Sequence, residues 1–337
     1  MRLIVTAAVL FAASPAIGQA WPGALKTFGD WAVGCDNTHR CTLASLAPET
    51  APNSGYTIAI TRAAEPAGGY EIAVGNTGDG AAPVSLRVGA KRFAVAGNGL
   101  SGGAAQQIVA ALTSVRTLML AGHTGKPLGT VSLAGISAAL RYVDAVQHRV
   151  DTVTAAVAKG RNAAATVPPA PATPVVHAPA LTGAPARLTR SQVAAMKRTA
   201  RCDAPPSTDL DWSPVVSTMG GGTSLAVLPC SAGAYNVNGA LFVIRGNRVT
   251  PAKTDAPAGF EATGADPETP VPSVVNGQVE NGVLTSYAKG RGLGDCGVSQ
   301  AFVWDGTSLR LIEQAEMSDC RGNPDFIRTW TARVERP

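Results

Sequence analysis

The sequence predicts an α+β, β-rich fold: two antiparallel-sheet domains with a few short helices, joined by a Pro/Ala-rich linker. Apolar residues alternate in many short segments bounded by turn residues, as is typical of strands, and few segments have helical spacing. Residues 160–187 are rich in Pro and Ala and divide the 337-residue chain, whose length suits about two domains. We therefore expect domains at 21–159 and 188–337, after a signal peptide at 1–20.

The first 20 residues follow the order of a Sec-type signal peptide. Arg2 gives a positive start, residues 3–13 are apolar or small, Pro15 ends that run, and residues 18–20 offer small side chains for cleavage. The alternative is a short buried helix, which would not require this order. No apolar run reaches the roughly 18–20 residues of a membrane span. We expect a periplasmic or secreted protein, cleaved near Ala20, with no membrane span.

The composition excludes several classes of protein. With 45% hydrophobic residues the chain is not wholly disordered, and it lacks the repeat of collagen. A net charge of +5 is mild for this length and does not favour nucleic acid. We expect the partner to be an unknown protein or an envelope ligand.

In the first domain, alternation predicts strands at 28–35, 56–62, 70–74, 84–88, 92–96 and 131–133. Turn residues such as Gly68, Asn76 and Gly89 separate several of these segments. Helical spacing of apolar residues predicts helices at 104–114 and 136–153, and Ser101 precedes the first of them as an N-cap.

The second domain begins with a predicted helix at 190–199, capped by Thr189. Strands are predicted at 224–228, 239–245 and 283–288. The strongest hairpin signal joins 301–304 to 309–312 through Asp305-Gly306, and further Asn-Gly turns are predicted at Asn238, Asn276 and Asn281.

All six cysteines follow the signal peptide, and export makes disulfides their expected state. They are Cys35, Cys41, Cys202, Cys230, Cys296 and Cys320. If the two domains share no bond, Cys35 must pair with Cys41. Among the other four, the sequence-local pairs Cys202–Cys230 and Cys296–Cys320 are favoured, although other connectivities stay open. No C-x-x-C occurs and the four histidines form no ligand pair, so no metal site is expected.

The segment GNGLSGG at 97–103 matches two catalytic patterns. A dinucleotide site would need an acidic residue about 20 positions later, but no Asp or Glu occurs from 102 to 142. A nucleophile elbow at Ser101 would need an acid and then a histidine; Asp144 and His148 follow in that order. However, these two share one predicted helix and the βαβ repeats of that fold are missing. A glycine-rich turn with a serine N-cap is favoured, so no catalytic or cofactor residue is assigned.

Charged residues near the C-terminus could supply a carboxylate pair for general acid–base chemistry. They are Asp295, Glu313, Glu316, Asp319 and Asp325, with Arg321 among them. Their linear spacing brings no two together, so a solvated sheet face with salt bridges around a disulfide is the favoured interpretation. Trp304 and Trp330 are expected in the core.

Five segments carry a resemblance to known proteins. They are 28–46 (FGDWAVGCDNTHRCTLASL), 131–144 (VSLAGISAALRYVD), 228–236 (LPCSAGAYN), 294–306 (GDCGVSQAFVWDG) and 317–330 (MSDCRGNPDF…TW). Together they resemble the exported Gram-negative family known as domain of unknown function 1176. The first half is also similar to the invasion-associated locus B family. Neither resemblance implies a reaction or catalytic residues, and an invasion role is not carried over.

These observations favour an exported, disulfide-stabilised binding or interaction module without catalysis. One alternative is a cell-envelope hydrolase that uses Ser101 or the C-terminal carboxylates. Another is an inhibitor or accessory protein of a secreted enzyme.

Non-reducing peptide mapping of the purified protein is expected to join Cys35 to Cys41 and to find no free thiol, because each domain closes its own bonds. A bond that crosses residues 160–187 would contradict both the pairing and the two-domain division.

Overall fold

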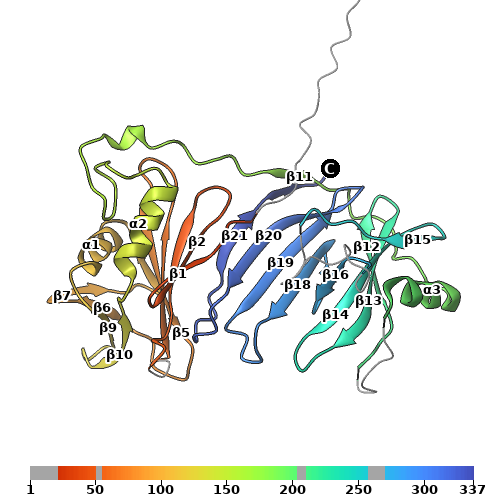
Figure 1. The fold of residues 1–337 in the computed structure, drawn as a ribbon, viewed down its shortest axis with the longest axis horizontal. Coiled ribbons are helices and arrows are strands. Elements are labelled where there is room, and N and C mark those ends of the chain that lie inside the picture. Colours follow the sequence, from red (N-terminus) through yellow and green to blue (C-terminus); the bar gives the residue numbers. More distant parts are fainter. Residues whose placement is uncertain (1–21, 51–54, 203–209, 257–269) are drawn as a thin grey trace, which may run out of the picture.

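The structure is a computed structural model that describes residues 22–50, 55–202, 210–256 and 270–337 (Figure 1). The predicted signal peptide lies outside these residues. The described part is rich in antiparallel sheet and holds three α-helices of 11 residues each, which confirms the predicted fold class.

The first half of the chain forms two antiparallel sheets and two helices. The larger sheet has the order β1 (Lys26–Phe28), β2 (Trp31–Cys35), β3 (Cys41–Ser45), β4 (Tyr56–Arg62), β5 (Tyr70–Asn76) and β8 (Gly99–Ser101). The smaller sheet has the order β10 (Pro127–Ser132), β9 (Thr117–Ala121), β6 (Ser85–Val88) and β7 (Lys91–Ala94). Helices α1 (Gly102–Leu112) and α2 (Ile136–Val146) bury their apolar stripes in the core of this half, which includes Trp31, Ile58 and Leu140.

Two predicted elements of this half differ from the structure. The strand at 28–35 is two strands, because Gly29 adopts a positive φ of 58° in a turn that contacts the Ala134 backbone. The helix at 136–153 ends at Val146, because the Asp144 carboxylate accepts backbone N–H groups from residues 156–158 and the chain turns back to meet it.

The second half contains two antiparallel sheets that face each other. One has the order β12 (Val215–Gly220), β13 (Thr223–Ala232), β14 (Val237–Arg245) and β15 (Arg248–Pro251), with β16 (Ser273–Val275) paired to β14. The other has the order β17 (Gln278–Glu280), β18 (Val283–Lys289), β19 (Gly297–Trp304), β20 (Leu309–Met317) and β21 (Ile327–Thr331). Leu241, Phe302 and Trp304 belong to the apolar cluster between them.

Helix α3 (Arg190–Ala200) covers the outer face of the first of these sheets through Met196 and Ala200. Thr189 caps it as predicted and forms a capping box with Gln192. The predicted turn at Asn238 is wrong. Asn238 lies in β14 opposite Ser231, and the hairpin turns instead at 233–236.

The Pro/Ala-rich segment 160–187 crosses the molecule and packs against the second half (Figure 1). It contains a short 3-10 helix, η1 (Ala164–Thr166), and β11 (Val175–His177), which pairs in parallel with β22 (Arg333–Glu335). Pairing is possible here because 175–178 is a proline-free run between Pro174 and Pro179, so its N–H groups are available. Val176 and Ala178 are buried with Val303 against the outer face of the last sheet.

Three disulfides link the pairs that the sequence favoured: Cys35–Cys41, Cys202–Cys230 and Cys296–Cys320. The first closes the β2–β3 loop. The second joins Cys202, two residues after the end of α3, to β13. The third joins the residue before β19 to the loop after β20. Each bond stays within one half of the chain.

The two halves share an apolar cluster where β21 packs on β2 and β3. Ala32, Ala44 and Ile327 are fully buried there. Small residues on the first sheet allow the close approach, since a side chain at Gly34 would overlap Leu25 and Ile327. The division of the chain into two domains stays a prediction, and this cluster is the surface that such domains would bury.

Hydrogen bonds surround this cluster and join segments almost 300 residues apart. Asn37 both donates to the Thr331 carbonyl at 3.0 Å and accepts from the Thr331 N–H at 2.8 Å. Arg328 pairs with buried Asp36 at 2.8 Å, and Asn323, which is fully buried, donates to the Ser45 carbonyl at 2.7 Å. These bonds fix the register of the contact between the halves.

Replacement of Asn323 by Ala is expected to lower the free energy of unfolding by about 1–3 kcal/mol, because the buried Ser45 carbonyl loses its donor. Urea unfolding measures the change. Asn98→Ala, at an exposed turn, is the control and should stay within about 0.5 kcal/mol. Equal effects of the two variants would show that the Asn323 bond contributes nothing to stability.

Candidate functional site

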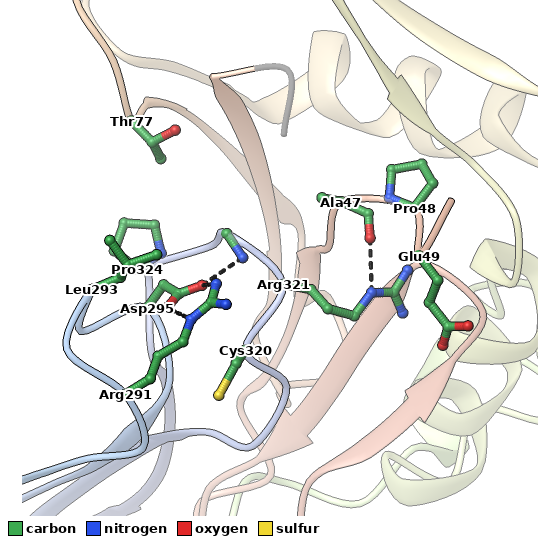
Figure 2. A pocket seen from close by; sticks show the side chains of 11 residues that line it. Ala47, Pro48, Glu49, Thr77, Arg291, Leu293, Asp295, Cys320, Arg321 and Pro324 are labelled. Atoms are coloured by element: carbon green, nitrogen blue, oxygen red, sulfur yellow. Dashed lines mark hydrogen bonds and ion pairs between the residues drawn. The ribbon is translucent and has the colours of Figure 1, made fainter. Parts of the chain in front are cut away.

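A cleft of about 460 Å³ opens at the edge of the contact between the halves (Figure 2). The first half contributes Ala47, Pro48, Glu49 and Thr77, and the second contributes Arg291, Leu293, Asp295, Cys320, Arg321, Gly322 and Pro324. Ligand sites often lie at such boundaries and fall in this range of volume.

One wall of the cleft is the loop 290–295, which several bonds hold in place. The Cys296–Cys320 disulfide fixes its end, the Tyr287 hydroxyl donates to the Gly294 carbonyl at 2.7 Å, and the Tyr235 hydroxyl donates to Gly290 at 3.3 Å. At its tip, Leu293 is 79% exposed, more than any other large apolar side chain in the described residues. The loop therefore presents an apolar side chain to solvent from a constrained backbone.

Three charged residues of the cleft, Arg291, Asp295 and Arg321, already have partners within the protein. The Arg291 Nε donates to Asp295 at 2.6 Å, and the Gly322 N–H donates to the same carboxylate at 2.7 Å (Figure 2). The bond from Arg291, followed by the one from Gly322, keeps the pKa of Asp295 below its usual value although burial opposes this. Asp295 is thus an ionised acceptor, which does not suit a general acid.

Arg321 lines the cleft and bonds the second half of the chain to the first. Its Nε donates to the Ala47 carbonyl at 2.7 Å (Figure 2). One terminal nitrogen donates to the Gly29 carbonyl at 2.9 Å, and the other pairs with Asp30. The Ala47 N–H donates in return to the Arg321 carbonyl at 2.9 Å. Arg321 therefore shapes the cleft rather than offering a mobile charge to a ligand.

Ser101, Asp144 and His148, the residues of the disfavoured nucleophile-elbow interpretation, are not arranged as a catalytic triad. Ser101 is an exposed residue of β8 at the start of α1, and its side chain makes no capping bond to that helix. The Asp144 carboxylate is fully buried and turned to Arg62 and to the backbone of Ala156 rather than to His148. The structure thus does not arrange them as nucleophile, base and orienting acid.

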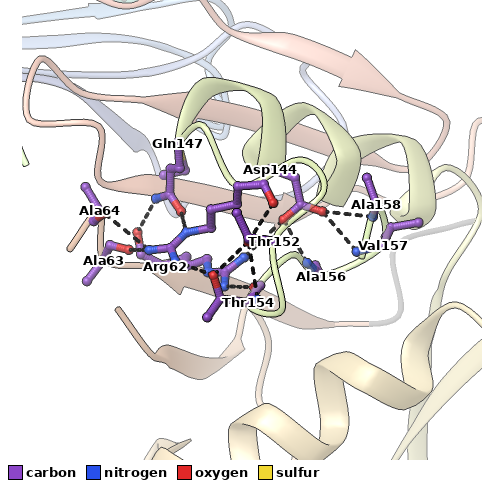
Figure 3. Close-up of polar contacts among 12 residues, drawn as sticks. Arg62, Ala63, Ala64, Asp144, Gln147, Thr152, Thr154, Ala156, Val157 and Ala158 are labelled. Atoms are coloured by element: carbon purple, nitrogen blue, oxygen red, sulfur yellow. Dashed lines mark hydrogen bonds and ion pairs between the residues drawn. The ribbon is translucent and has the colours of Figure 1, made fainter. Parts of the chain in front are cut away.

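Asp144 belongs to a buried polar network that ties the loop after α2 to the first sheet (Figure 3). Arg62 pairs with it at 3.1 Å, and both side chains are almost fully buried. Arg149, also fully buried, donates to the carbonyls of residues 63–66 and to Thr154, and Gln147 accepts from its Nε at 2.9 Å.

Burial is the largest cause of the pKa shifts in this network. It lowers the pKa of Arg62 and lowers that of Arg149 to about 10, while it raises the pKa of Tyr70 to about 12. The two guanidinium groups each have carboxylate or carbonyl acceptors around them. The network is therefore a structural clamp, in which the buried Arg62 Nε and Tyr70 hydroxyl are left without a hydrogen-bond partner among the described residues.

The C-terminal carboxylates do not converge. Asp319 accepts from Thr27, Asp325 from Thr57 and Glu316 from Ser318. Only Asp295, together with Arg321, lines the cleft. Glu49 and Leu293 were not predicted as site residues, and the alternating glycines of GRGLG at 290–294 were the one available signal for an exposed loop. Trp304 and Trp330 pack in or against the core, as expected.

Two features of the described residues bear on cofactors and membranes. No group of three His, Cys, Asp or Glu side chains among them could hold a metal ion. None of their helices is long and apolar enough to cross a membrane.

The model of a family described as "Protein of unknown function (DUF1176)" matches residues 25–333, nearly the whole described chain. This chain belongs to that family. A curated relative, the uncharacterized protein YpfG of Escherichia coli (strain K12), is 30% identical over 214 residues. The match covers 60% of this chain and 60% of that relative, so the chain spans under two thirds of its length.

Among solved structures, the invasion associated protein B of Bartonella henselae has 20% sequence identity to this chain and a TM-score of 0.28. The match covers 37% of this chain and 99% of that protein.

Replacement of Asp144 by Asn is expected to lower the free energy of unfolding by about 3–5 kcal/mol, because it leaves the buried Arg62 without its counter-charge. Chemical denaturation at pH 7 measures the loss. His148→Ala, four residues away and exposed but at a positive φ of 54°, should change stability by no more than about 1 kcal/mol. A large loss with His148→Ala and none with Asp144→Asn would contradict the assigned roles.

Proposed function

We propose that this protein is exported to the periplasm or beyond as a non-catalytic binding module, and that it holds a chain segment of another protein in the cleft beside Leu293. The exposed Leu293 on its constrained loop is the observation that carries this proposal. Three disulfides support export, because such bonds persist in oxidising compartments.

The cleft suits a polypeptide in both chemistry and size. Leu293, Pro48 and Pro324 offer apolar contacts, while Glu49 and the half-exposed Arg291 offer charges of both signs at its rim. Gly292 leaves backbone exposed beside them. An apolar anchor among polar contacts is the usual composition of a protein interface centre.

Absence of catalysis is part of the proposal and rests on how the candidate groups are used. Asp144 is committed to Arg62 and the backbone, and the lowered pKa of Asp295 keeps it ionised. These arrangements favour a scaffold over an acid–base pair.

Action as an inhibitor or accessory protein of a secreted enzyme is a second candidate. It is favoured by the same loop, because a loop already held in one conformation loses little entropy when it docks. The identity of the bound partner separates this candidate from a general binding role.

Replacement of Leu293 by Asp is expected to weaken peptide binding at least tenfold, because burial of a leucine contributes about 1.5–3 kcal/mol. The probe is a set of linear peptides selected on the purified protein from a phage-displayed library, with affinities measured by fluorescence polarisation.

Val215→Asp is the matched control, since Val215 is 60% exposed on β12, outside the cleft. It should leave the affinity unchanged. The proposal fails if no peptide is selected, or if the selected peptides bind the Leu293→Asp and Val215→Asp proteins equally well.

A further inference from the structure

A second concave site lies at the open edge of the two facing sheets of the second half. Its volume is about 240 Å³. It is lined by Val243, Arg245, Arg248, Thr250, Pro251, Lys253, Trp304 and Thr307. Three of these residues are cations, two carry hydroxyl groups, and none is acidic. The site therefore concentrates positive charge around donors in a small hollow.

The hairpin of β14 and β15 places two of the cations side by side. Arg245 is directly opposite Arg248 in the antiparallel register, and Val243 is opposite Thr250 two residues further along. Alternate residues of a strand share a face, so all four side chains lie on the face that meets Trp304. Like charges directly opposite each other repel, and an anion between them would relieve that repulsion.

Arg245 is held in one orientation before any ligand arrives. Its Nε donates to the Thr223 hydroxyl at 3.2 Å, a terminal nitrogen donates to the Gly306 carbonyl, and the guanidinium lies 5.4 Å from the Trp304 ring centre. The other terminal nitrogen of Arg245 can donate to an oxyanion, and a guanidinium that is already fixed loses little entropy on binding.

Nearby carboxylates do not neutralise this charge. Asp255 and Asp305 both face Arg310, at 3.3 and 3.7 Å, and the Asp305 carboxylate also accepts from Thr307 and Ser308. Within the described residues, none of the three site cations forms an ion pair with an acid. Their charge is therefore available to a ligand.

We propose that this site binds a phosphate group. Arg245 supplies an oriented guanidinium, Arg248 and Lys253 supply further positive charge, and the hydroxyl of Thr250 supplies a hydrogen bond, whereas the Thr307 hydroxyl donates to Asp305 at 2.7 Å. Three cations suit a phosphate better than a carboxylate, which carries a single negative charge. The volume accommodates a headgroup rather than a large ligand. The phosphate belongs either to a small soluble molecule or to a phospholipid headgroup, and the two sources share this chemistry.

The test uses the full mature chain and two probes. Inorganic phosphate is titrated by calorimetry at low ionic strength, and vesicles of phosphatidylcholine with or without phosphatidylglycerol are tested by co-sedimentation. The variant Arg245→Gln/Arg248→Gln is expected to bind at least tenfold more weakly than the unchanged protein. Binding by the unchanged protein should also weaken as salt is added.

Arg87→Gln/Arg92→Gln is the matched control, because Arg87 and Arg92 are also directly opposite each other, in the β6–β7 hairpin of the first half. Like the site variant, it removes two positive charges from an opposed pair in a hairpin. It should keep the affinity for phosphate within twofold of that of the unchanged protein. Arg248→Gln/Lys253→Gln leaves the Arg245 contacts intact and should also weaken binding, which separates loss of charge from disturbance of Trp304. Circular dichroism checks that every variant folds.

Each outcome decides the proposal or the source of the phosphate. Loss of phosphate binding only in the site variants supports a soluble ligand, and loss only of phosphatidylglycerol-dependent vesicle binding supports a lipid headgroup. If the unchanged protein binds neither probe, or if the control loses as much affinity as the site variants, the proposal is overturned. Leu293→Asp should leave phosphate binding intact, since the two sites are separate.

Discussion

The docking of residues 317–331 on the outer face of the first sheet is the contact on which the other features depend. Its apolar part is small and consists largely of Ala32, Ala44, Leu46 and Ile327. Polar bonds complete it: Arg321 reaches three acceptors in the first half, and Asn323 reaches a fourth. Since a cluster of small side chains specifies little by shape, these directional bonds define which register the halves adopt. The cleft and the position of Leu293 follow from that register.

The same contact joins two of the segments that carry the resemblance to the family. FGDWAVGCDNTHRC at 28–41 places Asp36 and Asn37 in a loop closed by a disulfide, and MSDCRGNPDF…TW at 317–330 begins at the end of β20 and reaches into β21. Asp36 pairs with Arg328, and Asn37 bonds to Thr331. The two segments are thus the opposing sides of one interface. In this chain, these residues of the two segments therefore have a structural role at the interface.

Elements with local signals were predicted from the sequence, and those that depend on distant partners were not. The helix cap at Thr189, the β4 strand and the Asp305-Gly306 hairpin each have their determinants within a few residues. By contrast, the end of α2 depends on Asp144 and a loop that returns to it, and β11 forms only because β22, more than 150 residues later, offers an edge. Leu293 and Glu49 come together through the same kind of distant contact. The spacing of residues along the sequence does not indicate which distant segments come together in space, so the cleft was not predictable.

The strongly shifted pKa values in the first half of this chain belong to buried structural groups rather than to a catalytic site. Strongly shifted pKa values usually draw attention to active sites. Here several of the shifted groups, Arg62, Tyr70 and Arg149, lie in a buried clamp whose guanidinium groups meet protein acceptors. At the cleft, Asp295 shifts towards its charged form, and the charge of Arg321 is matched by Asp30. A site built to move protons needs a group held near its point of titration, whereas a site built to bind needs fixed charges and an exposed anchor. The cleft has the second set of properties, and this physical difference favours recognition over catalysis.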